Sequence, residues 1–428
     1  MKAKIGNSEV SGTVSAPPSK SYTHRAVLAG LYADELEVKD PLMSADPRAS
    51  IRCAESLGAE VEELENSLKI EGVDGEPETP ENILDCGNSG TTLRLFTGAA
   101  ALAEKAAVLT GDKSLVERPN NPLIETLNDL GAETFSTKYD GAAPLVVNGK
   151  ISSGDTCIDG TVSSQFISSL LFCMPLTDEG GRLEIEGELK SRPYVDITIE
   201  VLEDMGVEIN DYMEGFEIPG GQSYSSEEFQ VPGDFSSASY PLAAGALAGK
   251  VRVENLYPSA QGDERILDVL ERMGAEVDWN TRAGVAEVSE GVLEGIKFDA
   301  SDNPDLVPTV AVLASQASGR TEIVNAEHLR FKETDRLEAM ATELSIMGAE
   351  VEEGEDYLVI DGDRSELEGG EVDGRDDHRV VMALALAGLA AEGETVVDTA
   401  ECVEISYPGF FSDLEDLGVQ IEEAGKIT

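Results

Sequence analysis

Five short stretches gather basic residues in a chain that is otherwise strongly acidic. They are PPSKSYTHR (17–25), VERP (116–119), LKSRP (189–193), LRFKETDR (329–336) and GRDDHR (374–379). Together they hold about a third of the 31 Lys and Arg residues, whereas Asp and Glu number 84. Arg can bond both oxygens of a carboxylate or phosphate, and Lys supplies a compact charge. The clusters therefore predict binding of small polyanions.

For any single Lys or Arg, the alternative is an ordinary ion pair with a surface carboxylate. Two pairs of residues favour a bound anion instead. If the stretches are helical, Lys332 and Arg336 lie four residues apart on one face, as do Arg375 and Arg379. Like charges at that spacing repel each other, and an anion bound between them would remove the repulsion.

Two carboxylates could transfer protons at such a site. A carboxylate among cations or in a desolvated cleft can be tuned toward proton transfer, and Glu333 and Asp305 are the candidates. The alternative for each is a solvated or capping acid. Gly90, within NSGTT, could present backbone N–H groups to a phosphate or simply allow a turn.

No metal and no cofactor are expected. The three histidines, His24, His328 and His378, have no spacing that gives several convergent ligands, and the five cysteines include no CxxC pair. Neither GxxxxGK[ST] nor GxGxxG occurs, so nucleotide binding is unsupported. No GxSxG occurs, and no Cys lies beside a His, so covalent acyl chemistry has no nucleophile.

The elements that must position these residues recur six times. A Leu-Gly or Met-Gly pair is followed by apolar residues alternating with polar, mostly acidic ones, as in SLGAEVEE and RMGAEVDW. Glycine adopts positive φ at low cost, so the pattern predicts an amphipathic helix ended by glycine and then a strand. The six glycines are Gly58, Gly131, Gly206, Gly274, Gly348 and Gly418.

A second repeated element precedes each of these glycines. Small polar residues lead into an apolar stretch in SKSYTHRAVLAGLYA, NSGTTLRLFTGAA, SSQFISSLLFCM, FSSASYPLAAGALAG, NPDLVPTVAVLAS and DDHRVVMALALAGLA. Polar residues before such a stretch are typical N-caps, and helices that are apolar on every side are buried. Because helix starts expose N–H groups and the positive end of a dipole, all six are candidate anion sites.

The net charge of −53 is spread along the whole chain of 428 residues. Such a surface repels nucleic acid and anionic membranes, so neither is an expected partner. It also repels itself unless salt screens it, which predicts a high-salt cytoplasm. The longest apolar run, 380–391, is too short to span a bilayer, and the first residues contain no apolar signal segment. We expect a soluble cytoplasmic protein.

The motifs occur in the order seen in the 5-enolpyruvylshikimate-3-phosphate synthase family, which the chain resembles over nearly its whole length. The matching segments are PPSKSYTHR, GNSGTTLRL, ERP, SSQFISSLL, SRPYVDIT, FSSASYPLAA, FKETDRL and DDHRVVMA. The resemblance implies an α/β fold of two similar domains, each an inside-out α/β barrel of three βαβαββ repeats, joined by a hinge that the chain crosses twice. One domain would comprise residues 19–231, and the other 1–18 and 232–428.

The resemblance also implies a reaction between two small molecules, phosphoenolpyruvate and shikimate 3-phosphate. The enolpyruvyl group would pass to the 5-hydroxyl of shikimate 3-phosphate with release of phosphate, on the shikimate route to chorismate and the aromatic amino acids. Motif by motif, the shikimate 3-phosphate contacts would be Lys20, Ser21, Arg25, Ser163, Ser164, Gln165, Ser191, Tyr194, Asp305 and Lys332. The phosphoenolpyruvate contacts would be Lys20, Gly90, Arg118, Gln165, Arg336 and Arg379.

The resemblance assigns the catalytic roles to Asp305, Glu333 and Lys20. Asp305 would take the hydroxyl proton, Glu333 would serve the methylene carbon, and Lys20 would stabilise charge near both. Closure of the domains would exclude water and bring the basic clusters together. We expect a monomer.

Two positions depart from the family pattern. Many members carry a Lys before the Ser/Thr-Tyr/Phe-Pro of the last repeat, where this chain has Ile405, so one expected cation at the phosphoenolpyruvate site is missing. Affinity for phosphoenolpyruvate and its analogues then depends on whether another basic residue substitutes. His328 stands where some relatives have Asn, and we interpret it as a weak substrate contact.

Two other functions stay open. An enolpyruvyl transferase with the same fold acts on a UDP-linked amino sugar, but it carries a Cys in the loop before its Arg-Pro, which TGDKSLVERP lacks. A noncatalytic anion-binding or storage protein could also keep the fold. KETDR disfavours the first, and the presence of Lys20, Asp305 and Glu333 disfavours the second.

Overall fold

The chain divides into two compact units. The structure, a computed structural model, describes residues 1–424. The continuous unit is Pro18–Pro232, and the split unit combines Met1–Pro17 with the chain from Gly233 onward. The chain therefore passes between the units twice, after Pro17 and after Pro232.

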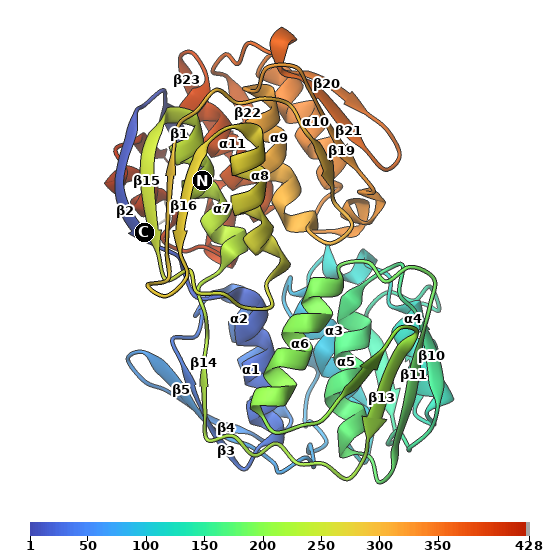
Figure 1. The fold of residues 1–428 in the computed structure, drawn as a ribbon. Coiled ribbons are helices and arrows are strands. Elements are labelled where there is room, and N and C mark those ends of the chain that lie inside the picture. The colour runs from blue at the N-terminus through green and yellow to red at the C-terminus, as the bar shows by residue number, and fades with distance from the viewer. Residues whose placement is uncertain (425–428) are drawn as a thin grey trace. The chain divides into compact units, whose positions relative to one another are not determined.

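The continuous unit contains three four-stranded sheets, ordered β14-β3-β5-β4, β6-β7-β9-β8 and β10-β11-β13-β12 (Figure 1). Its strands are β3 (Glu35–Lys39), β4 (Glu60–Glu63), β5 (Ser67–Glu71), β6 (Leu84–Asp85), β7 (Ala107–Thr110), β8 (Glu133–Ser136), β9 (Leu145–Asn148), β10 (Thr156–Asp159), β11 (Gly180–Glu186), β12 (Asn210–Tyr212), β13 (Gly215–Pro219) and β14 (Glu228–Gln230). Its helices are α1 (Lys20–Tyr32), α2 (Ala45–Ser56), α3 (Gly90–Ala100), α4 (Asn121–Asp129), α5 (Ser164–Cys173) and α6 (Arg192–Asp204).

The described part of the split unit contains three sheets of the same size, ordered β16-β17-β15-β2, β18-β19-β21-β20 and β22-β23-β1-β24. Its strands are β1 (Lys2–Gly6), β2 (Val10–Ser15), β15 (Gly249–Glu254), β16 (Glu276–Asn280), β17 (Val285–Ser289), β18 (Lys297–Asp299), β19 (Arg320–Val324), β20 (Glu350–Glu353), β21 (Leu358–Asp361), β22 (Glu371–Asp373), β23 (Glu394–Asp398) and β24 (Gln420–Ala424). Its helices are α7 (Phe235–Ala248), α8 (Ile266–Met273), α9 (Val307–Ser315), α10 (Arg336–Ile346), α11 (His378–Ala390) and α12 (Phe410–Asp416).

The six sheets formed by residues 1–424 share one pairing pattern. An edge strand pairs in parallel with its neighbour, and the remaining two pairings are antiparallel. In β6-α3-β7-α4-β8-β9, for example, one helix joins the parallel strands and a second helix leads to the antiparallel pair. This βαβαββ order confirms the predicted repeat of one buried helix, one outer helix and intervening strands.

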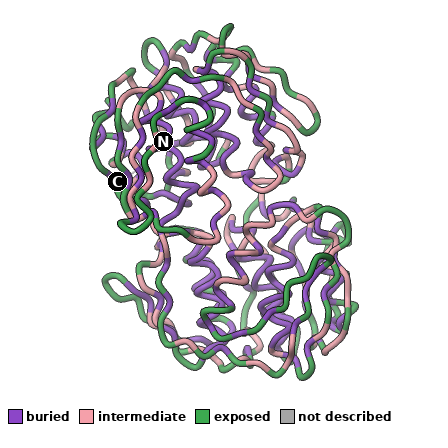
Figure 2. The backbone as a smooth tube through the Cα atoms, viewed as in Figure 1, coloured by how far each residue is buried: buried purple, intermediate pink, exposed green. Residues whose placement is uncertain are grey.

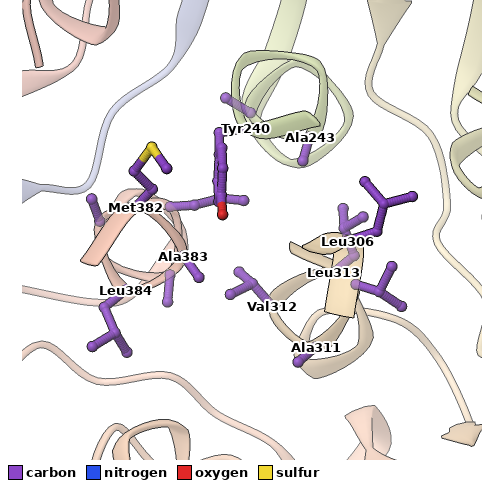
Figure 3. Packing of buried hydrophobic residues seen from close by; sticks show 14 of the residues in the cluster. Tyr240, Ala243, Leu306, Ala311, Val312, Leu313, Met382, Ala383 and Leu384 are labelled. Atoms are coloured by element: carbon purple, nitrogen blue, oxygen red, sulfur yellow. The ribbon is translucent and has the colours of Figure 1, made fainter. Parts of the chain in front are cut away.

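The cores of the units are built on the buried helix of each repeat. In the split unit these are α7, which leads into β15, and α9 and α11, which each join two parallel strands. Their buried residues include Tyr240, Val312 and Leu384. Figure 3 shows Tyr240 and Val312 in the space between these helices, and Figure 2 shows that the helices inside each unit are mostly buried while exposed positions gather on the loops and sheets around them. Helices made of small apolar residues can approach closely, and removing such surfaces from water drives the packing.

The outer helices end as predicted. The six glycines after them adopt positive φ, between 77° at Gly206 and 107° at Gly58. A left-handed residue lets the last turn close and the chain reverse into the next strand. The predicted N-caps are confirmed by side-chain hydrogen bonds at Ser89, Ser163 and Asp377. At α7 the cap is Asp234, one residue before the predicted stretch, whose serines lie inside the helix. The predicted caps fail at α1, where Ser19 makes no capping bond, and at α9, which begins after Leu306.

Among the described residues no helix is both long enough and apolar enough to cross a membrane.

Candidate active site

In the continuous unit, polar side chains gather where α3 and α5 begin. Arg94 NH1 donates to Gln165 Oε1 at 2.7 Å and to Ser163 Oγ at 3.3 Å. Gln165 Nε2 donates in turn to Thr91 Oγ1 at 2.9 Å. The Arg94 guanidinium also lies over the ring of Phe166, 5.0 Å from its centre. These contacts hold the starts of α3 and α5 side by side. The positive ends of both helix dipoles therefore lie close to the Arg94 guanidinium.

Gly90 and Arg118 belong to the same cluster. Arg118 NH2 donates to Ser114 Oγ at 3.1 Å and to Asn88 Oδ1 at 3.4 Å. A Cβ atom at position 90 would lie 3.0 Å from Arg118 NH1 and 4.0 Å from Gln165 Oε1. Glycine thus keeps the start of α3 open beside Arg118 and Gln165, so the structure brings together three of the residues predicted for phosphoenolpyruvate.

Lys20 is tied to this cluster through α2. Its Nζ donates to Asp46 Oδ2 at 3.2 Å, and both side chains are largely buried. The carbonyl oxygen of Asp46 accepts a 3.5 Å hydrogen bond from Thr92 Oγ1, and Thr92 also bonds Ser89 at the cap of α3. Lys20 therefore lies at the start of α1, and the Asp46 carboxylate holds its ammonium group in place.

Arg25 lies deep between α1, α5 and α6. Only 1% of it is exposed. Its guanidinium donates to Thr198 Oγ1, the Ser21 carbonyl and the Tyr194 carbonyl, each at 2.8 Å. Burial lowers the pKa of Arg25 to about 10, which leaves it charged at neutral pH. The structure gives Arg25 a clear role in joining these helices.

Five more residues predicted for shikimate 3-phosphate lie at helix starts of the continuous unit. Ser163 caps α5, and Ser164 is its first residue. Ser191 precedes α6 with φ of 55°, and its carbonyl oxygen accepts from the Tyr194 backbone N–H at 3.1 Å. Ser21 is the second residue of α1. The five residues therefore share the starts of the three helices that Arg25 joins.

In the split unit, Arg336 is surrounded by three carboxylates. Its NH1 donates to Asp305 at 2.7 Å, its NH2 to Glu333 at 2.7 Å, and its Nε to Asp377 at 2.8 Å. Only 1% of the Arg336 side chain is exposed. Burial alone would lower the pKa of Arg336, but the three negative charges outweigh it and raise that pKa well above the usual value. Arg336 is permanently cationic.

Arg379 joins this network from α11. Its NH2 forms an ion pair with Asp305 Oδ2 at 2.9 Å. Asp305 lies in the short helix η4 (Pro304–Leu306), and 15% of its side chain is exposed. One carboxylate thus bridges two of the three arginines predicted for phosphoenolpyruvate, Arg336 and Arg379. Glu333, the second predicted proton-transfer group, also contacts Arg336.

The helical spacing expected for two basic pairs is wrong. Lys332 follows the short helix η5 (Glu327–Phe331) in extended backbone, whereas Arg336 is the first residue of α10. Arg375 lies before α11 in left-handed backbone, and Arg379 lies inside that helix. In each case an Asp between the pair caps the helix and changes the chain direction, so the two cations do not share a helical face.

The histidines and Ile405 also have defined places. His24 is buried in α1, where its Nδ1 lies 2.8 Å from Ser50 Oγ. His328 is buried in η5, and His378 is the buried first residue of α11. Ile405 ends the short helix η7 (Ala400–Ile405). Within residues 1–424, no three His, Cys, Asp or Glu side chains are grouped so that they could hold a metal ion.

Three site residues were missed by the sequence analysis. Arg94 connects Gln165 to Ser163, Asp46 holds Lys20, and Asp377 holds Arg336. Arg94 sits in the capped stretch NSGTTLRL, which was a usable signal. Asp46 and Asp377 are two among 84 acidic residues, and only their burial distinguishes them.

Comparison with known proteins identifies one family. Residues 5–414 match the family model described as EPSP synthase (3-phosphoshikimate 1-carboxyvinyltransferase). The chain is 52% identical to the 3-phosphoshikimate 1-carboxyvinyltransferase of Methanococcoides burtonii, covering 98% of this chain and 99% of that protein. It is 51% identical to that of Halobacterium salinarum, covering 99% of this chain and 100% of that protein.

Solved structures show the same architecture. EPSP synthase from Acinetobacter baumannii superposes with a TM-score of 0.82 and 26% sequence identity, covering 99% of this chain and 100% of that one. The two-domain α/β fold expected from the sequence is thereby confirmed. The chain belongs to the EPSP synthase (3-phosphoshikimate 1-carboxyvinyltransferase) family.

Proposed function

We propose that this chain transfers the enolpyruvyl group of phosphoenolpyruvate to the 5-hydroxyl of shikimate 3-phosphate through the residues described above. The supporting observation is the Arg336 network, in which a permanently charged guanidinium contacts both predicted proton-transfer groups, Asp305 and Glu333. A site of this kind pairs an anion-binding cation with acid and base groups, as the reaction requires.

The chemistry needs two proton transfers. The 5-hydroxyl loses its proton as its oxygen bonds to C2 of phosphoenolpyruvate, and C3 gains a proton to become a methyl group. The tetrahedral intermediate then loses a proton from that methyl group and expels phosphate, which restores the double bond. In the proposal Asp305 accepts the hydroxyl proton, and Glu333 exchanges the proton at C3.

Phosphoenolpyruvate is proposed to compete with these carboxylates for the arginines. Asp305 accepts from NH1 and Glu333 from NH2 of Arg336, whereas the fully buried Asp377 accepts from Nε. A substrate carboxylate or phosphate that bonds Arg336 and Arg379 takes over that charge. Asp305 and Glu333 would then be released to act on the reacting atoms, which couples substrate binding to catalysis.

The continuous unit is proposed to supply the remaining contacts. Gly90, Arg118 and Gln165 would serve phosphoenolpyruvate, and Lys20 would serve both substrates. Shikimate 3-phosphate would contact the residues at the starts of the helices joined by Arg25, together with Lys332 and Asp305 of the split unit. The shikimate 3-phosphate residues in the continuous unit are Lys20, Ser21, Arg25, Ser163, Ser164, Gln165, Ser191 and Tyr194.

We also propose a cytoplasmic monomer without a cofactor. Both substrates are soluble phosphorylated acids, and the scheme above needs only proton transfers and charge stabilisation. The uniformly acidic surface opposes close approach of a second copy. Sedimentation velocity in concentrated KCl should give a single species of about the chain mass of 45.5 kDa. A dimer there would contradict the monomer.

The test is phosphate release from the two substrates together in concentrated KCl. Glu333→Gln and Asp305→Asn should each keep shikimate 3-phosphate binding by calorimetry and lose about 100-fold or more in kcat, since proton transfer contributes about 10²–10⁴. Glu338→Gln is the matched control, because this exposed carboxylate lies in the first turn of α10. Near-normal turnover in both test variants would contradict the catalytic roles.

The same assay separates the competing functions. Neither substrate alone should release phosphate, and a UDP-linked amino sugar should not replace shikimate 3-phosphate. A noncatalytic binding protein would bind the substrates without releasing phosphate from the pair.

A further inference from the structure

Asp263 is a buried carboxylate of the split unit that the scheme above does not use. It lies in the short helix η3 (Gly262–Arg265), and only 4% of it is exposed. Its Oδ2 accepts a hydrogen bond from the Ser236 hydroxyl in the first turn of α7. Its Oδ1 accepts from Asn303 Nδ2 at 3.3 Å. Burying a carboxylate is costly even when it is bonded on both oxygens, so its position needs an explanation.

Asn303 connects Asp263 to the predicted base. It is 1% exposed and immediately precedes η4, whose second residue is Asp305. While its Nδ2 donates to Asp263, its Oδ1 accepts from Arg265 NH1 at 3.2 Å. The amide is therefore bonded at both ends. Leu306, on the other side of Asp305, is fully buried in the core drawn in Figure 3. The turn that carries Asp305 is therefore held before it by Asn303 and after it by Leu306.

Charges from other elements also face Asp263. These are Asp305 of η4 and Arg379 of α11, and Arg265 of η3 reaches it through Asn303. Burial and then the negative charge of Asp305 raise the pKa of Asp263 to about 6, against the opposing effect of its hydrogen bonds and Arg379. The two carboxyl groups thus lie close enough for each to affect the proton affinity of the other.

We propose that Asp263 is a positioning residue for Asp305: through Asn303 it fixes the turn that carries Asp305, and its buried negative charge strengthens Asp305 as a proton acceptor. This inference rests on the proposed catalytic role of Asp305. Both effects act on the chemical step, because a base displaced by about 1 Å can cost about 100-fold in rate. A nearby negative charge favours the protonated form of a carboxylate.

The first test is Asp263→Asn, which keeps the side-chain volume and can still bond Ser236. We expect kcat to fall about tenfold while KM for either substrate changes less than about twofold. The acidic limb of the kcat profile should move to lower pH, because Asp305 then no longer faces a second negative charge. The matched control is Asp413→Asn, a half-buried carboxyl of α12 that accepts from the Tyr407 hydroxyl at 2.7 Å. It should leave kcat and the acidic limb unchanged.

A second variant separates position from charge. Asn303→Ser breaks the link from Asp263 to the turn but leaves the Ser236–Asp263 hydrogen bond. It should lower kcat about tenfold without moving the acidic limb. The double variant should lose little more than Asp263→Asn alone, since both changes act through one contact. If both variants have a lower melting temperature but the same kcat and acidic limb as Asp413→Asn, Asp263 has only a structural role. That result would overturn the proposal.

Asp305→Asn distinguishes the catalytic role proposed for Asp305 from the positioning role proposed for Asp263. If it keeps normal turnover, the catalytic assignment of Asp305 and the Asp263 inference both fail. If it loses turnover while Asp263→Asn and Asn303→Ser match the control, only the inference about Asp263 fails.

Discussion

Arg336 and Asp377 form a two-point ion pair inside the split unit, with Nε donating to Oδ2 at 2.8 Å and NH2 donating to Oδ1 at 3.3 Å. Arg336 begins α10, and Asp377 caps α11 by accepting from the Arg379 backbone N–H at 2.9 Å. One carboxylate, itself 0% exposed, therefore fixes an arginine from each of two helices. Its negative charge also offsets the desolvation cost of burying the Arg336 guanidinium.

Asp377→Asn should weaken phosphoenolpyruvate binding. An amide can accept only one of the two guanidinium bonds and carries no charge, so Arg336 would turn more toward Asp305 and Glu333. We expect KM for phosphoenolpyruvate to rise about tenfold and the free energy of unfolding to fall by about 2 kcal/mol, the typical cost of a lost charged hydrogen bond. Asp376→Asn, the exposed neighbour, should change neither quantity. Equal KM values for the two variants would argue against Asp377 as the support of this site.

Gly90→Ala should impair phosphoenolpyruvate binding without unfolding the protein. The new Cβ would lie 3.0 Å from Arg118 NH1, so the guanidinium must shift and strain its contacts with Ser114 and Asn88. Alanine is the better helix former by about 1 kcal/mol, which opposes any loss of stability. KM for phosphoenolpyruvate should rise several-fold with an unchanged melting temperature. Gly370→Ala is the control, because nothing lies within 4 Å of its added carbon.

His24 should make the protein less stable in mild acid. Burial, with Lys20 and Arg25 nearby, holds the pKa of His24 well below 6.5. Below pH 6.5 the unfolded chain therefore binds a proton at this residue that the folded chain does not. Stability is lost as pH falls, at up to about 1.4 kcal/mol per pH unit. Urea unfolding in constant KCl at pH 5, 6 and 7.5 should show this slope for the wild type and a smaller one for His24→Gln. Parallel slopes would show that His24 does not contribute.

The repeated elements could be predicted from the sequence because their signals are local. A glycine such as Gly274 adopts φ of 106° after an amphipathic helix, and small polar residues such as Ser89 cap the helix that follows them. Neither signal depends on residues far away in the chain. Six copies in register then specified the whole architecture, since each repeat buries its apolar helix against the others.

The carboxylates that hold the charged site residues in place could not be predicted in the same way. The spacing of Lys332 and Arg336 suggested one helical face, but Asp335 caps α10 and places Lys332 outside it. Asp377 and Asp263 are buried partners of site residues, yet in sequence they look like the other acids of a very acidic chain. Which carboxylates turn inward is decided by tertiary contacts with arginines and amides far along the sequence.

The acidic surface should make stability depend on salt at identifiable positions. Glu60 and Glu71 face each other directly across β4 and β5, whereas Glu63 of the same strand pairs with Arg48 at 2.8 Å. Like charges in register repel by up to about 1 kcal/mol, and the Debye length falls to about 3 Å in 1 M salt. Glu60→Gln should therefore raise the melting temperature by a few degrees at about 0.1 M KCl and much less at 2 M. Glu63→Gln should give no such gain, because it removes an attraction. If the two variants respond alike to KCl, the salt requirement arises from overall charge alone, and the register of these strands does not matter.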